Sequence, residues 1–381
     1  MEDNIKLTEN KKNENLKKEQ KVRNYGIDFI RIIAMYGIVL SHIMYIKKTR
    51  KKYRKFKQLK ILHIVFFWHN NAFAFISGFV GHKGYKYSNL FYLWMCTSFY
   101  SFIIYSFYLA YKPQFIVKDK FYHNLFPIIF KKYWFFTAYF GMYLFLPIIN
   151  KGIAFLSKSE LKNSIINIFV LLVFWHDIMN QNHDIFNTNR GYSLLWLLIL
   201  YITGGYFGKY QINLVGVKKF NFCLIIFLIY IFISFIFFFI YHKTNNRNED
   251  IKLRNLIILK QLISENYDSI MKVIQSISII FFLMQINYNK YLGKIISFIG
   301  TLTFGVYLIH YNKYIRDDIL SKLFDNEKNN ISLFSVYKLF ITKSLFVFII
   351  CIFIDYLRNI LFKFFKIRKI CIILDKKCLK Y

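Results

Sequence analysis

The stretch YGIDFIRIIAMYGIVLSHIMYI, residues 25–46, decides the fold because it is long enough to cross a bilayer yet carries Asp28, Arg31 and His42. A hydrocarbon core of about 30 Å needs roughly 20 mostly apolar residues in a helix. Arg31 and His42 are eleven positions apart, which at about 100° per residue returns them to one helix face, roughly 16 Å apart along the axis. This spacing predicts a membrane helix with an arginine near one boundary and a histidine well inside.

Two interpretations of these three side chains are open at this point. In the first, Asp28 and Arg31 merely pair at the end of the helix, three positions apart, and His42 is a hydrogen-bonded core histidine. In the second, they belong to a functional site, because ionisable residues inside a membrane are costly and are functional candidates by default.

The run IDFIRIIAMYGIVLSHI resembles the first transmembrane helix of the acyltransferase 3 family, integral-membrane acyltransferases that modify surface carbohydrates. The hallmark of that family is an Arg, ten residues and a His, matched here by Arg31 and His42. The resemblance covers roughly residues 24–365 through several motifs in order. It implies membrane-embedded acyl transfer, with His42 as the base and Arg31 as a group that attracts the phosphates of acyl-CoA or orients the site, while Asp28 fixes the Arg31 rotamer.

Three later runs resemble the same family. FISGF contains Ser77 and is followed by Lys83 and Lys86, where many members carry an Arg pair; the departure leaves a point charge without the fork of Arg. YWFFTAYFGMYLFLP contains Trp134, and FIGTLTFGVYLIH ends at His310. The alternatives are membrane-surface lysines, an interfacial tryptophan and an interfacial or hydrogen-bonded histidine. The resemblance implies that these five residues, with Asp28, bind substrate.

Composition points to a membrane protein. Of the 381 residues, 56% are hydrophobic and 21% aromatic, more apolar material than one soluble core of this size requires. The net charge of +33 would suggest a nucleic-acid partner in a soluble protein, but the Lys and Arg residues cluster in the tails and between apolar runs. We therefore expect membrane lipid as a partner and no nucleic acid.

We predict an all-α, polytopic membrane protein with about ten transmembrane helices. Residues 1–24 are predicted to be a disordered polar tail, 25–365 the transmembrane domain and 366–381 a basic cytoplasmic tail. The predicted spans are residues 25–46, 61–80, 89–111, 132–150, 164–179, 192–210, 220–241, 269–286, 295–311 and 336–354.

Four local predictions accompany these spans. Pro147 is expected to close the fourth helix. Gly78 and the Gly204–Gly205 pair are expected to allow close helix approach. His176 and Asp177 are expected to be a capping or surface pair outside the site.

The orientation rests on two opposing signals. Ten spans place both termini on one side, and the basic tails and the resemblance favour the cytoplasm. The basic segment at residues 47–60 would then face outward, against the same positive-inside bias. We follow the tails and expect a multi-pass protein of the cell membrane with both termini cytoplasmic.

Two functions from different classes fit these patterns. The first is transfer of an acyl group, acetyl by default, from acyl-CoA to a hydroxyl of a surface carbohydrate or lipid-linked glycan, with acyl-CoA as co-substrate and no bound cofactor. The second is a transporter or flippase of carbohydrate or lipid-linked intermediates. The ordered motifs and the lack of repeated broken spans favour the enzyme. The five cysteines have no metal-ligand spacing, and no HExxH or GxSxG motif is present, so no metal is expected. His42 is expected to be the only histidine that combines a deep position in a span with the Arg spacing of the family.

Overall fold

The computed structural model describes residues 23–49, 60–116, 121–174, 186–210, 217–244, 266–323 and 333–378. Within these ranges the regular structure is helical and contains no strand, which confirms the all-α prediction. The longer helices are α2 (Tyr25–Thr49), α4 (His69–Gly81), α5 (Tyr87–Tyr111), α7 (Trp134–Phe155), α8 (Lys158–Phe169), α10 (Leu194–Lys209), α11 (Val217–Thr244), α13 (Ile270–Met284), α14 (Lys290–His310), α15 (Leu333–Phe364) and α16 (Ile367–Cys378).

Six segments of the described chain are long and apolar enough to cross a membrane, as expected of a membrane protein. They are Tyr25–Ile46, Ile64–Gly81, Tyr87–Tyr111, Trp134–Phe155, Lys290–His310 and Phe334–Phe364. The apolar helices Leu194–Lys209, Asn221–Ile236 and Ile270–Met284 are shorter.

The predicted span at 164–179 falls on α8 and a π-helical segment, Val170–Phe174. Residues 175–179, including His176 and Asp177, lie outside the described residues. The count of about ten spans therefore stays a prediction.

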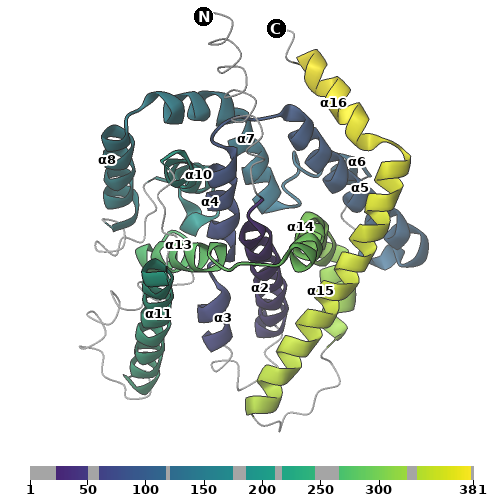
Figure 1. The fold of residues 1–381 in the computed structure, drawn as a ribbon. Helices are drawn as coiled ribbons and strands as arrows, with labels where there is room; N and C mark the ends of the chain where they lie inside the picture. The colour runs from purple at the N-terminus through teal and green to yellow at the C-terminus, as the bar shows by residue number, and fades with distance from the viewer. Residues whose placement is uncertain are drawn as a thin grey trace, which may run out of the picture.

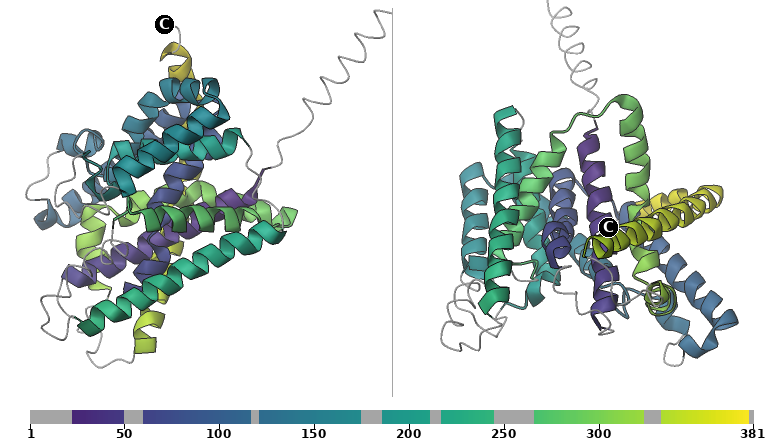
Figure 2. Two further views of the ribbon diagram at one scale, coloured as in Figure 1. Left: turned by 90° about the vertical axis from the view of Figure 1, so that its left-hand side faces the viewer. Right: turned by 90° about the horizontal axis from the view of Figure 1, so that it is seen from below.

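Helix α2 lies in the middle of the molecule, and α4, α13, α14 and α15 pack around it (Figure 1). Helices α8 and α11 lie on one side of α2, and α5 and α15 lie on the other, in both Figure 1 and the view from below in Figure 2. Apolar side chains of α2, α5, α14 and α15 form the largest core cluster, which includes Val39, Tyr100, Val306 and Phe340. The central position of α2 brings its polar face against several helices at once.

The second predicted span is not one continuous helix. The short helix α3 (Lys60–Phe66) ends before Phe67 and Trp68, and α4 begins at His69. The Trp68 amide donates to the Phe66 carbonyl at 2.8 Å, a tight turn that breaks the regular helical ladder. The break places the polar run that starts at His69 at the beginning of α4, beside α2.

Two helix ends differ from the sequence prediction. Pro147 lies inside α7, which continues to Phe155, so the expectation that Pro147 closes this helix is wrong. A membrane helix tolerates an internal proline because neighbouring groups can satisfy the carbonyl that loses its partner. Helix α15 continues to Phe364, ten residues beyond the predicted end of its span. Residues 367–378 of the predicted tail form helix α16, which packs against α5.

Close backbone approach joins α4 to α10. A Cβ added at Gly78 would lie 1.9 Å from the Tyr201 carbonyl oxygen, and one added at Gly204 would lie 2.0 Å from the Phe75 carbonyl oxygen. In a membrane the hydrophobic effect does not drive helices together, and small residues let their backbones pack closely instead. The predicted packing role of both glycines is confirmed.

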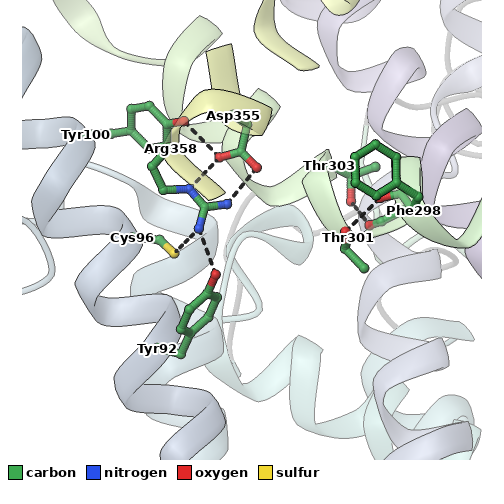
Figure 3. A network of polar contacts seen from close by, with 9 residues as sticks. Tyr92, Cys96, Tyr100, Phe298, Thr301, Thr303, Asp355 and Arg358 are labelled. Carbon is green, nitrogen blue, oxygen red and sulfur yellow. Dashed lines mark hydrogen bonds and ion pairs between the residues drawn. The ribbon is translucent and has the colours of Figure 1, made fainter. Parts of the chain in front are cut away.

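A buried polar network ties α15 to α5 (Figure 3). Arg358 pairs with Asp355 through two hydrogen bonds, of 2.9 Å from Nε and 2.7 Å from Nη2. The same guanidinium donates to Tyr92 at 2.8 Å, and Tyr100 donates to Asp355 at 2.8 Å. Arg358 or Asp355 without the other would be an uncompensated charge in an apolar region, so the pair is kept together. The hydrogen bonds of this pair to Tyr92 and Tyr100 hold α15 and α5 in register.

Candidate active site

A cavity of about 650 Å³ lies between α2, α4, α7 and α14. Five of the eight residues singled out from the sequence line it: Arg31, His42, Ser77, Trp134 and His310. Its wall is mostly aromatic, with Phe67, Phe73, Phe135, Phe136, Phe304 and Tyr307 among the lining side chains. Arg31 and His42 line the same cavity, on the shared helix face that their spacing predicts.

Arg31 lies at one end of the cavity and is held by Asp28. Arg31 Nη1 donates to Asp28 Oδ1 at 2.8 Å, and Arg23 Nε donates to Asp28 Oδ2 at 2.8 Å. Asp28 is in the first turn of α2, where a carboxylate is favoured by the helix dipole, and its side chain is 3% exposed. Asp28 does not line the cavity itself. It fixes the position of the Arg31 guanidinium.

Ser77 belongs to the same end of the cavity. Its hydroxyl donates to the Phe73 carbonyl one turn earlier at 2.7 Å and lies 3.5 Å from the Tyr139 hydroxyl. Tyr139 also lines the cavity and is near enough to Arg31 for an electrostatic interaction. The hydroxyl of Ser77 is therefore engaged within its own helix.

His42 is half-buried on α2 and faces His310 of α14. His42 Nδ1 lies 3.0 Å from His310 Nε2, and His310 Nδ1 lies 2.6 Å from the Val306 carbonyl oxygen. The Tyr311 ring packs beside His42 with the ring centroids 5.0 Å apart. Two histidines far apart in the sequence thus form one hydrogen-bonded chain that ends on a backbone carbonyl.

When both rings are neutral, these contacts determine their tautomers. A carbonyl oxygen only accepts, so His310 Nδ1 carries a proton and donates it to Val306. His310 Nε2 is then the acceptor, and His42 Nδ1 donates to it. His42 Nε2 is left with its lone pair, which is the state that a general base requires.

Of the two alternatives for His310, interfacial or hydrogen-bonded, the structure shows a hydrogen-bonded residue. The residue is 1% exposed, because α2 and the segment after α14 cover it.

The segment after α14 is anchored to α5 by Asp318, which forms ion pairs with Lys112 and Lys322 and accepts a hydrogen bond from Tyr108 at 3.0 Å. The hydrogen bonds from the two lysines lower the pKa of Asp318 to about 2.

The sequence analysis missed His69, a second deeply placed histidine, which lacks the Arg spacing of His42. His69 is 2% exposed and lines the cavity together with Ser41 and Asn70. Ser41 Oγ lies 3.4 Å from His69 Nε2, and His69 Nδ1 lies 3.1 Å from Asn70 Oδ1. The signal available in the sequence was the polar run HNN, residues 69–71, inside a stretch that otherwise reads as one apolar span.

The end of the cavity away from Arg31 is lined by a second set of polar and aromatic groups. Trp134 packs against Tyr192 with the ring centroids 4.6 Å apart, so its ring is part of the cavity wall. Arg190 and Arg316 lie in the same lining, and Arg316 Nε donates to Asp317 at 2.8 Å. Positive charge is therefore available to the cavity from three arginines.

Lys83 and Lys86 do not line the cavity. Both are exposed on the segment that follows α4. The backbone of Lys86 is fixed by Tyr143, whose hydroxyl donates to the Lys86 carbonyl at 2.7 Å. Among the described residues, no group of three or more His, Cys, Asp or Glu side chains has an arrangement suited to a metal ion.

Comparison with known proteins gives one match. A family model described as an acyltransferase domain, Acyl_transf_3, matches residues 24–354. This range includes the cavity and the helices that build it. No match was found among curated proteins, and none among solved structures.

Proposed function

Because the chain belongs to the acyltransferase 3 family and is therefore an acyltransferase, we propose that it moves an acyl group, acetyl by default, from acyl-CoA to a hydroxyl of a surface carbohydrate or lipid-linked glycan. The observation that carries the proposal is the chain of contacts from His42 Nδ1 to His310 Nε2 and from His310 Nδ1 to the Val306 carbonyl, which holds His42 at the wall of a largely aromatic cavity. A base held in this way by a third group is the arrangement that activates a hydroxyl for acyl transfer.

In the proposed reaction, His42 Nε2 accepts the proton of the acceptor hydroxyl as its oxygen bonds to the acyl carbon. The hydrogen bond from His42 Nδ1 to His310 stabilises the positive charge that forms on the imidazole, since it is stronger when the donor is charged. The carbon–sulfur bond of the thioester breaks, and the leaving sulfur takes the proton from His42 Nε2. Proton transfer by a positioned side chain contributes about 10²- to 10⁴-fold.

Arg31 is proposed to hold the anionic part of the donor. Its hydrogen bond to Asp28 uses Nη1 alone, and a guanidinium has five N–H donors in a fixed fork. The remaining donors match the oxygens of a phosphate group. Arg31 lies roughly 16 Å along α2 from His42, so a donor that binds there must extend a flexible arm to the base.

Lys83 and Lys86 are proposed to attract the donor rather than to bind it. Ser77 lies at the Arg31 end of the cavity, and Lys83 follows six residues later, beyond the end of α4. Two exposed cations near this end favour the approach of an anionic substrate, an effect that salt screens. With both termini in the cytoplasm, as proposed, this side of the protein faces the pool of acyl-CoA.

The acceptor is proposed to enter from the end lined by Trp134. Aromatic rings such as those of Trp134 and Tyr192 offer apolar faces for the C–H surface of a sugar ring, while tyrosine hydroxyls can bond to sugar hydroxyls. Surrounding membrane lipid keeps bulk water from most of the outer surface. This limits hydrolysis of the thioester.

The function is tested by mass spectrometry of surface glycans from cells with and without the gene. Cells with the gene are expected to carry an acetyl mass that is lost on deletion and restored by the wild-type chain but not by His42→Ala. Restoration by His42→Ala would contradict the assigned base. An unchanged acetylation pattern combined with a changed amount of surface glycan would favour the transporter function instead.

A further inference from the structure

We propose that Ser41 is a second catalytic residue, a nucleophile that carries the acyl group as an ester before the acceptor receives it; the inference rests on the proposed function. Ser41, His69 and Asn70 line the cavity, and each contacts the next. Ser41 Oγ lies 3.4 Å from His69 Nε2, and His69 Nδ1 lies 3.1 Å from Asn70 Oδ1. A hydroxyl, a base and a group that orients the base, each within reach of the next, form the geometry of an activated nucleophile.

The hydrogen bonds determine which nitrogen of His69 is free to act. Asn70 Oδ1 only accepts, so His69 Nδ1 carries the proton and donates it. His69 Nε2 is therefore unprotonated and accepts from Ser41 Oγ. The Tyr267 hydroxyl lies 3.5 Å from His69 Nδ1 on the same side as Asn70. The base points its lone pair at the serine.

Burial separates a fixed base from an accessible nucleophile. His69 and Asn70 are 2% and 6% exposed, and both lie in the first turn of α4 just after the break from α3. Ser41 is half-buried and lines the cavity. The second predicted span is interrupted between α3 and α4. Because α4 begins at His69, the first residue of this helix lies beside Ser41.

The chemistry balances in two steps. In the first, Ser41 Oγ bonds to the thioester carbon, its proton moves to His69 Nε2, the carbon–sulfur bond breaks, and the CoA sulfur leaves with that proton. In the second, the acceptor hydroxyl oxygen bonds to the ester carbon and its proton moves to His42 Nε2. The bond to Ser41 Oγ breaks, and Ser41 takes the proton from His42. No oxidant, metal or further co-reactant is consumed.

Two bases in one cavity then have separate tasks. Ser41 and His42 both line the cavity, so an ester on Ser41 and the base His42 share the same space. His69 is oriented by Asn70, whereas His42 is oriented by His310 and the Val306 carbonyl. A covalent intermediate also means that the donor can leave before the acceptor enters, so the cavity does not have to hold both at once.

The test uses the purified full-length chain and radiolabelled acetyl-CoA without any acceptor, followed by denaturation. Wild type is expected to retain label on the protein, and peptide mass spectrometry is expected to place an acetyl group on Ser41. Ser41→Ala is expected to lose the label, and exchange of free CoA into acetyl-CoA should fall by about a hundredfold or more. Ser41→Cys is expected to carry a thioester that neutral hydroxylamine removes.

The matched control is Ser278→Ala, because the Ser278 hydroxyl donates to Ile274 of its own helix at 2.7 Å and does not line the cavity. This variant should keep the label. Asn70→Asp retains an acceptor for His69 and should keep more exchange than Asn70→Leu. The inference is overturned if Ser41→Ala keeps label or exchange. It is also overturned if the wild type transfers acetyl to the acceptor without carrying label. In both cases the proposed function stands. Absence of both label and transfer counts against both.

Discussion

Removing the acceptor that orients His42 should slow acyl transfer without changing donor binding. In His310→Leu, the His42 Nδ1 proton loses its partner at 3.0 Å, and the ring can adopt the other tautomer or turn away from the substrate. A lost hydrogen bond at a buried donor costs about 1–3 kcal/mol. If that cost falls on the transition state, kcat drops about 5- to 150-fold. His310→Gln retains an oxygen acceptor near the place of Nε2 and should recover part of the loss.

The assay is transfer of labelled acetyl from acetyl-CoA in membranes that hold equal amounts of each variant, with kcat and KM measured across pH. His310→Leu should lower kcat, leave the KM for acetyl-CoA near the wild-type value and alter the pH profile. His123→Leu is the control, because His123 lies on α6 (Phe121–Leu125) and does not line the cavity. Wild-type kcat in His310→Leu, or an equal loss in the Gln variant, would refute the orienting role.

Three further predictions concern the donor, the fold and the orientation. Arg31→Ala should raise the KM for acyl-CoA about tenfold or more, and Arg31→Lys less, because Lys keeps the charge without the fork; equal KM values in the kinetic assay would contradict the donor site. Gly305→Ala should lower the free energy of unfolding by about 1–3 kcal/mol, since the new Cβ would lie 1.9 Å from Asp355 Oδ1. Gly152→Ala, with open space around the new Cβ, should leave the stability unchanged, and a thermal-shift measurement compares the two variants. A cysteine placed at Lys83 should react with an impermeant maleimide only from the cytoplasmic side, and labelling from outside intact cells would reverse the orientation.

The sequence was informative where a single helix carries the pattern. The eleven-residue spacing of Arg31 and His42 follows from helix geometry alone, so it placed both residues on one face before any partner was known. The sequence also marked Gly78 and Gly204 as places of close helix approach, but it did not show that α4 and α10 are the two helices that meet there.

The rest depends on contacts between distant segments. Nothing local shows that α4 starts again at His69, since Phe67 and Trp68 are not helix-breaking residues, and the break is visible only with the neighbouring helices in place. The partners of His42 and Asp355 also come from other elements: His310 is 268 residues away, and Tyr100 is 255 residues from Asp355.

The central claim is that His42 is the base for transfer to the acceptor. The most direct measurement is the rate of labelled acetyl transfer from acetyl-CoA to the acceptor glycan in membranes with equal amounts of wild type, His42→Ala and His42→Gln. Both variants should remain in the membrane, because a helix with one polar group removed still spans it. Their transfer rates should fall about 10²- to 10⁴-fold. Transfer at the wild-type rate in His42→Ala would contradict the claim.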